Sequence, residues 1–110
     1  MAGDEPAVTD AVDANRYELR LGDAVAGYAE YHRRGAGQTA FTHTVVDEQY
    51  GGRGFGSRLI RGALDAERAA GRAVLPYCPF VRGYLEKHPE YLDLVPAQRR
   101  SEFSLQEETS

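Results

Sequence analysis

The chain has 110 residues, which suits one domain and is too short for two. Its hydrophobic share of 42% and charged share of 27% are ordinary for a globular protein, and no apolar run is long enough to cross a bilayer. The net charge of −4 argues against a general nucleic-acid binder, and the single cysteine, Cys78, excludes an internal disulfide and a Cys-rich zinc site. With no signal-peptide pattern, we expect a cytoplasmic protein that binds neither membrane nor nucleic acid and holds no metal.

Composition divides the chain into an ordered middle and two loose ends. Residues 1–15 are acidic, small and without periodicity, which predicts a disordered N-terminal segment. Residues 98–110 are polar and predict a flexible tail. The expected domain therefore spans residues 16–97.

The first half of this domain reads as three strands. Apolar and charged residues alternate over residues 17–21, as in a half-buried strand. Gly22-Asp23 is a two-residue turn of the kind that closes hairpins, and a second strand is expected over residues 24–32. A third strand, rich in Thr, Val and Phe, is expected over residues 38–46. The pattern indicates an antiparallel meander.

The second half reads as helix, strand and helix. Apolar residues recur at helical spacing over residues 55–70, and Gly71 is a natural helix stop. A short strand over residues 73–75 is followed by a second helix that Pro79 opens and His88-Pro89 ends. The sequence thus predicts an α+β fold (α/β type), with about four mostly antiparallel strands, two helices and the order β-β-β-α-β-α.

A glycine-rich turn joins the third strand to the first helix. Its four glycines within six residues, from Gly51 to Gly56, exceed what a tight turn needs. Glycine lets successive N–H groups converge on an anion, and a helix N-terminus adds partial positive charge. The turn is not a Walker loop, and its spacing fits a dinucleotide-binding fingerprint poorly. A phosphate or pyrophosphate site is favoured over a turn that binds nothing.

Two residues outside the turn carry reactive side chains. Cys78 lies at a strand end just before a helix, where a thiol is either a small buried apolar group or a functional one. In the second case it lines a ligand pocket or acts as a nucleophile that takes a group covalently. His43 lies in the third strand, and by alternation should share a side with Phe41 and Val45. Its imidazole is either a half-buried structural group or one that takes a proton from an ammonium or from Cys78.

Residues 45–56 resemble the acetyl-coenzyme A motif of the GCN5-related N-acetyltransferases. Gly54 and Gly56 fit the two small positions of that motif and Gly52 an interior glycine, whereas Gly51 stands where the family has Gln or Arg. The run from Cys78 to Tyr91 is similar to a subgroup of minimal single-domain members. The resemblance covers roughly residues 17–95.

The resemblance implies acetyl-coenzyme A as the cofactor. It places Cys78 and His43 near the coenzyme thiol as catalytic residues, and makes Tyr84 a possible acid because it is one residue from the family's usual tyrosine. Backbone groups of the third strand would bond the thioester and the pantetheine arm, and the glycine-rich turn would hold the pyrophosphate. The implied cofactor-binding residues are Thr44, Val45, Val46, Gly51, Gly52, Arg53, Gly54, Phe55, Gly56, Ser57 and Arg58.

The functional prediction is an N-acetyltransferase that moves an acetyl group from acetyl-coenzyme A to a primary amine of a small molecule or peptide. One alternative is a coenzyme A-binding regulatory or interaction module with little or no transferase activity. Another is a small structural domain whose turn binds no cofactor. The sequence leaves the acceptor and the oligomeric state open.

Overall fold

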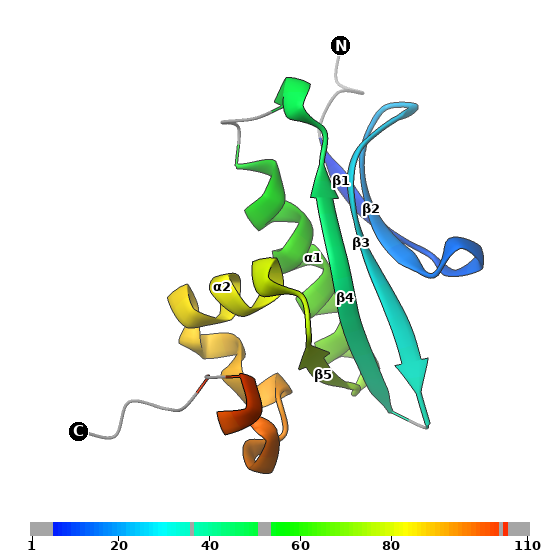
Figure 1. Cartoon of the computed structure of the whole chain (residues 1–110). Helices are drawn as coiled ribbons and strands as arrows, with labels where there is room; N and C mark the ends of the chain where they lie inside the picture. The colour runs from blue at the N-terminus through cyan, green and yellow to red at the C-terminus, as the bar shows by residue number, and fades with distance from the viewer. Residues whose placement is uncertain (1–5, 36, 51–53, 104, 106–110) are drawn as a thin grey trace.

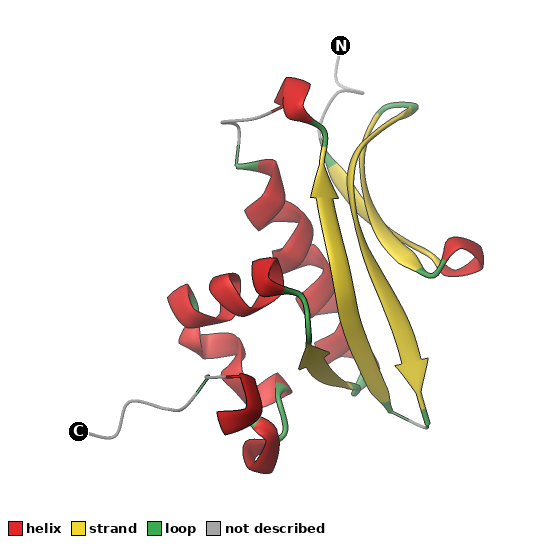
Figure 2. Ribbon diagram, viewed as in Figure 1, coloured by secondary structure: helices red, strands yellow, loops and turns green. Residues whose placement is uncertain are grey.

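A computed structural model describes residues 6–35, 37–50, 54–103 and 105. The fold is α+β, as predicted, and the predicted order β-β-β-α-β-α is confirmed with one further strand in front of it. Figures 1 and 2 show a curved sheet with both α-helices packed beside it. The strands are β1 (Ala7–Ala11), β2 (Arg16–Leu21), β3 (Ala24–Arg34), β4 (Gln38–Val46) and β5 (Ala73–Pro76), and the helices are α1 (Phe55–Ala70) and α2 (Pro79–Lys87).

The five strands lie in the sheet in their chain order. Each pair from β1 to β4 is antiparallel, whereas β5 joins β4 in parallel after the crossover through α1. A parallel pair needs such a crossover, and the helix supplies it. The parallel pairing is short, because it joins only residues 38–41 of β4 to β5.

The prediction of a disordered N-terminal segment is wrong for Ala7–Ala11, which form the edge strand β1. Hydrophobic periodicity did not reveal this strand because Val8 is its only large apolar residue. Two tertiary contacts secure it. Val8 packs on Gly62 of α1, and the Asp10 carboxylate accepts hydrogen bonds from Tyr31 and Arg33.

The expected flexible tail also contains structure. Short 3-10 helices lie at Ala97–Arg99 and Ser101–Phe103, and a further one at Pro89–Leu94 precedes the tail within the expected domain. Phe103 and Leu105 are buried, and the Phe103 ring packs edge-on against Tyr77 with ring centroids 5.1 Å apart. Two apolar residues with one polar residue between them, in an otherwise polar segment, are too weak a pattern to predict this docking from sequence.

One face of the sheet, here called the closed face, packs against α1, which contacts all five strands. Its aromatic centre is formed by Tyr17, Tyr31 and Phe41, whose ring centroids lie 5.4 to 6.3 Å apart. Gly62 lets α1 approach closely, since a Cβ there would come within 2.7 Å of the Val8 side chain. This close packing explains why a glycine occupies the interior of α1 at this position.

A buried carboxylate fixes α1 to this face. Glu67 has no exposed surface and accepts hydrogen bonds from Tyr17, from Thr39 at 2.7 Å and from Arg72 at 2.8 Å, while Arg33 lies 3.3 Å away. Burial by itself would raise the pKa of Glu67, but these hydrogen bonds and the arginine charges hold it below its usual value. Burial and the same carboxylate raise the pKa of Tyr17.

A β-bulge interrupts the pairing of β3 with β4. Glu30 pairs with His43 and Tyr31 pairs with Phe41, so Thr42 is the extra residue. The bulge lies where the pairing of β4 with β5 ends, and there it reverses the alternation of side chains along β4.

In the described part of the chain, no helix is long and apolar enough to cross a membrane.

Candidate active site

The candidate site begins where β4 and β5 separate. The Cys78 N–H donates to the Phe41 carbonyl at 3.0 Å, and past this bond β4 has no strand neighbour on that side among the described residues. The Asp47 N–H donates to the Ala26 carbonyl, and this bond shows which residues of β4 direct their main-chain groups toward β3. By alternation, the main-chain groups of Thr44 and Val46 therefore face the free edge, and those of Val45 face Tyr28. This edge offers amide and carbonyl groups to an extended ligand.

Cys78 lies against this edge. It is the N-cap residue of α2, its side chain is buried, and its Sγ is 3.2 Å from Oγ1 of Thr44. The short parallel pairing and the Phe41 bond hold the residue at the strand end. Thr44 was assigned to the site for its backbone groups. In the structure its side chain also takes part, because its hydroxyl contacts Cys78.

His43 lies on the opposite face of the sheet from Phe41. The expectation that these two residues share a side is wrong, because the bulge at Thr42 intervenes between them. The His43 side chain is exposed and stands beside Glu30 and Val45, whereas Phe41 and the Thr44–Cys78 contact lie toward the closed face. Activation of Cys78 by His43 therefore gains no support from the strand geometry.

The N-terminus of α1 follows the free end of β4. Gly54, with φ of 71°, is the N-cap residue and provides no side-chain cap, and the first turn contains no acidic residue. The first bond within the helix runs from the Arg58 N–H to the Gly54 carbonyl. The first N–H groups of an α-helix have no carbonyl acceptor within the helix, so a helix N-terminus that no side chain caps fits a phosphate group. Gly51, Gly52 and Arg53, which we also assigned to this cradle, lie outside the described residues.

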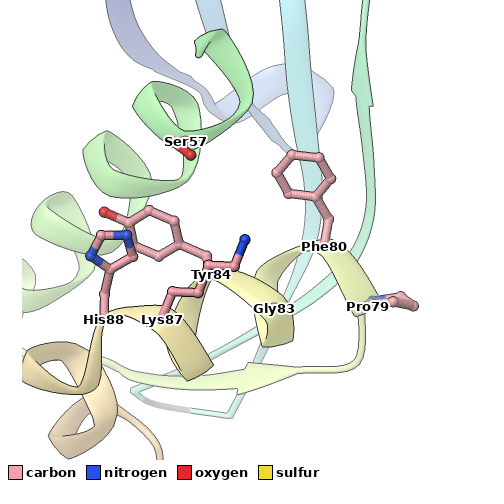
Figure 3. Close-up of a pocket in the computed structure, with 7 residues that line it drawn as sticks. All are labelled: Ser57, Pro79, Phe80, Gly83, Tyr84, Lys87 and His88. Carbon is pink, nitrogen blue, oxygen red and sulfur yellow. The ribbon is translucent and has the colours of Figure 1, made fainter. Parts of the chain in front are cut away.

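A groove runs between the first turns of α1 and the body of α2. One part, of about 230 Å³, is lined by Ser57, Pro79, Phe80, Gly83, Tyr84, Lys87 and His88. An adjoining part, of about 330 Å³, adds Gly54, Arg58 and Arg61. Figure 3 shows Phe80 at one end of the groove and the Tyr84 and His88 rings at the other, with Ser57 above them. The groove carries positive charge beside the helix N-terminus, which suits a phosphorylated ligand.

Tyr84 forms part of the groove wall. Its ring stacks on His88 with centroids 4.1 Å apart and is buried, and this burial raises the pKa of its phenol. Six residues separate it from Cys78, a rise of about 9 Å along a helix axis. Its position in the groove wall favours a role in ligand contact over the role of an acid that donates a proton near Cys78.

Sequence reasoning passed over Phe80 and His88 as site residues. Phe80 is 45% exposed, and its ring rests on Gly56, where a Cβ would come within 2.4 Å of the ring. His88, interpreted as a surface residue that ends a helix, stacks on Tyr84 in the groove. The spacing of Tyr84 and His88, four residues apart, is a signal that would have found this pair.

Comparisons with known proteins agree with this geometry. Residues 16–94 match the model of a family described as GCN5-related N-acetyl-transferase. The fold is similar to the NMR solution structure of a "GCN5-like putative N-acetyltransferase" from Staphylococcus aureus, with a TM-score of 0.64, 21% identity, and coverage of 87% of this chain and 91% of that one. Comparison with curated proteins gives no match. Because the family model spans most of the chain, this protein belongs to the GCN5-related N-acetyltransferase family.

Proposed function

We propose that this protein transfers an acetyl group from acetyl-coenzyme A to a primary amine of a small molecule or peptide. The observation that carries the proposal is the free edge of β4. The amides of Thr44 and Val46 face the free edge beside Cys78, and past this edge the chain continues to the N-terminus of α1, which no side chain caps. A ligand with a phosphate at one end and amide groups along an extended arm suits this path.

Each part of the path would hold one part of the cofactor. The first turn of α1, with Gly54, Phe55, Gly56 and Ser57, would bind the pyrophosphate, and Arg58 would add positive charge. The free edge at Thr44 and Val46 would pair with the amide-bearing arm. Cys78 would form the wall beside the thioester. When bound, acetyl-coenzyme A supplies an acetyl group that is already activated as a thioester.

The acceptor must lose a proton before its nitrogen can attack. His43 is the titratable side chain next to Thr44 on β4, and its imidazole is exposed to an incoming ammonium. We assign it the role of proton acceptor. Amine acceptance and a cytoplasmic location remain predictions from the sequence.

Two measurements on the full chain test this proposal. Coenzyme A should raise the thermal midpoint of unfolding, and thiol should be released from acetyl-coenzyme A in the presence of an alkylamine. His43→Gln should lower kcat by about a hundredfold, the lower range for lost acid–base catalysis, while the midpoint shift with coenzyme A persists.

His32→Gln is the matched control, because His32 is an exposed histidine on β3 that pairs with Ala40, away from the free edge. This variant should turn over like the wild type. A protein whose midpoint does not respond to coenzyme A would refute the cofactor assignment. A midpoint that rises without thiol release over a panel of amines would favour a coenzyme A-binding module.

A further inference from the structure

We propose that Glu30 is the anionic anchor that holds a cationic amine acceptor beside His43. The proposal rests on the proposed function and adds to it the class of acceptor, an alkylammonium group, and the face of the sheet from which it approaches. Glu30 lies on the face opposite α1, here called the open face, which carries Arg16, Glu18, Tyr28, Glu30, His43 and Val45 in register.

The other carboxylate of the open face, Glu18, already has cationic partners. Glu18 accepts hydrogen bonds from Arg16 at 2.9 Å and from Arg20 at 3.1 Å. Burial of Glu18 would raise its pKa, but these two arginines lower it. The Arg16 guanidinium also lies over the Tyr28 ring, 4.3 Å from its centroid. Arg16 thus contacts Glu18 and Tyr28. It makes no ion pair with Glu30, although the two residues are cross-strand partners.

Glu30 has no such partner among the described residues. Its carbonyl oxygen accepts a bond from Thr42, but its carboxylate makes no hydrogen bond or ion pair there, and the side chain is half-buried. Arg33, further along the same strand, bonds to Asp10 and Glu67 instead. A half-buried carboxylate without a cation costs free energy, which a bound ammonium would recover.

The bulge brings Glu30 into register with His43. The two residues are directly paired across β3 and β4, so their side chains stand next to each other on the open face. The next cross-strand pair on that face is Tyr28 with Val45; the Tyr28 ring lies under the Arg16 guanidinium, and Val45 presents half-buried apolar surface. An alkylammonium would therefore find a carboxylate, a proton acceptor and an apolar strip in adjacent positions, next to the Thr44 edge.

Steady-state kinetics with two acceptors test this role. n-Butylamine is a cation at neutral pH, whereas aniline is neutral. Glu30→Gln should raise KM for n-butylamine by about tenfold and leave KM for aniline and for acetyl-coenzyme A unchanged, because the ion pair is lost and the rest of the face is kept. Asp23→Asn, which removes one charge from the exposed turn between β2 and β3, should leave all three values unchanged. An equal KM for n-butylamine in Glu30→Gln and wild type would overturn the proposal.

A binding experiment separates this proposal from the proposed function. In 15N-labelled wild type, n-butylammonium chloride should shift the amide resonances of Glu30 and His43, and 1-butanol should not. Glu30→Gln should lose these shifts. Shifts that persist in the variant, or that centre on another face, overturn the anchor even if acetyl transfer is observed. Shifts that depend on Glu30 in a protein that transfers no acetyl group would refute the proposed function and, with it, the acceptor role.

Discussion

Glu67 and Glu30 are two carboxylates on opposite faces of the same sheet, and their surroundings differ in every respect. Glu67 is fully buried on the closed face and receives bonds from Tyr17, Thr39 and Arg72. Glu30 is half-buried on the open face, and its carboxylate has no partner among the described residues. A buried charge persists only when its bonding capacity is met inside the protein, so Glu67 has a structural role. A partly covered charge that lacks a partner is available to a ligand.

The difference has a topological cause. The crossover from β4 to β5 places α1 over one face of all five strands, and α2 contacts β4 and β5. Side chains of the closed face therefore meet helix residues, and they are largely apolar or bonded to one another or to Glu67. Side chains of the open face meet one another, which leaves room for an acceptor beside the edge of β4.

Breaking the Glu67 network should produce the largest effect in the protein. Glu67→Gln removes the charge that faces Arg33 and Arg72, and leaves Arg72 without its carboxylate partner, whereas Arg33 keeps its ion pair with Asp10. The expected loss is about 3–5 kcal/mol of the free energy of unfolding, the usual cost of breaking a buried pair. Denaturant unfolding measures it. Glu86→Gln, at an exposed position of α2, is the control and should keep the wild-type midpoint.

The same network predicts a pH dependence. The pKa of Glu67 is lower in the folded protein than its ordinary value of 4.5. Its contribution to stability is therefore complete above that value and is lost as the pH falls through the lower, folded pKa. Unfolding curves of the wild type should show this acid loss, and those of Glu67→Gln should show less of it. A variant as stable as the wild type and equally sensitive to acid would contradict the role given to Glu67.

The order of elements was predictable from sequence because each predicted element has a strong local signal. Alternation over residues 17–21, a period of 3.6 over residues 55–70 and glycine or proline at the boundaries mark them. β1 has no such signal. It is held in place by long-range contacts, of Val8 with α1 and of Asp10 with Tyr31 and Arg33 of β3. Local patterns do not report contacts made across the fold.

The candidate site divides in the same way. Cys78 and the N-terminus of α1 could be located from sequence because they sit at element ends that the pattern marks, whereas Thr44, inside β4, was assigned only through the family resemblance. The face of the sheet on which His43 lies could not be predicted from sequence. The bulge at Thr42 shifts the register by one residue, and simple alternation then gives the wrong face. Glu30 was missed for the same reason, because its pairing with His43 follows only from that register.

Substitution of Gly62 tests the packing of β1 on the closed face. A methyl group at this position would come within 2.7 Å of Cβ and Cγ2 of Val8, a short side chain that is stiff at χ1 and has little room to move. Gly62→Ala should destabilise by about 1 kcal/mol, since an overpacking cost of about 1–3 kcal/mol exceeds the gain in helix propensity of about 1 kcal/mol. The thermal midpoint measures the change.

Gly83→Ala in α2 is the matched control, because nothing lies within 4 Å of a Cβ there. It should raise stability by about 0.5–1 kcal/mol through helix propensity alone. Adding Val8→Ala to Gly62→Ala should relieve the clash. Equal stabilisation by Gly62→Ala and Gly83→Ala would show that β1 does not pack at this point.

The smallest expected effect concerns Thr44, whose backbone faces the free edge and whose side chain contacts Cys78. Thr44→Val keeps the shape of the side chain and removes the hydroxyl that lies 3.2 Å from Sγ. A hydrogen bond to sulfur is weak, so the activation free energy of the transfer should rise by about 0.5–1 kcal/mol. This corresponds to a two- to fivefold fall in kcat, while KM for acetyl-coenzyme A is retained. Thr44→Ser keeps the hydroxyl and should retain the rate. Full activity in Thr44→Val would show that the contact does not position the thiol for transfer, and an equal loss in Thr44→Ser would assign the effect to the missing methyl group and not to the hydroxyl.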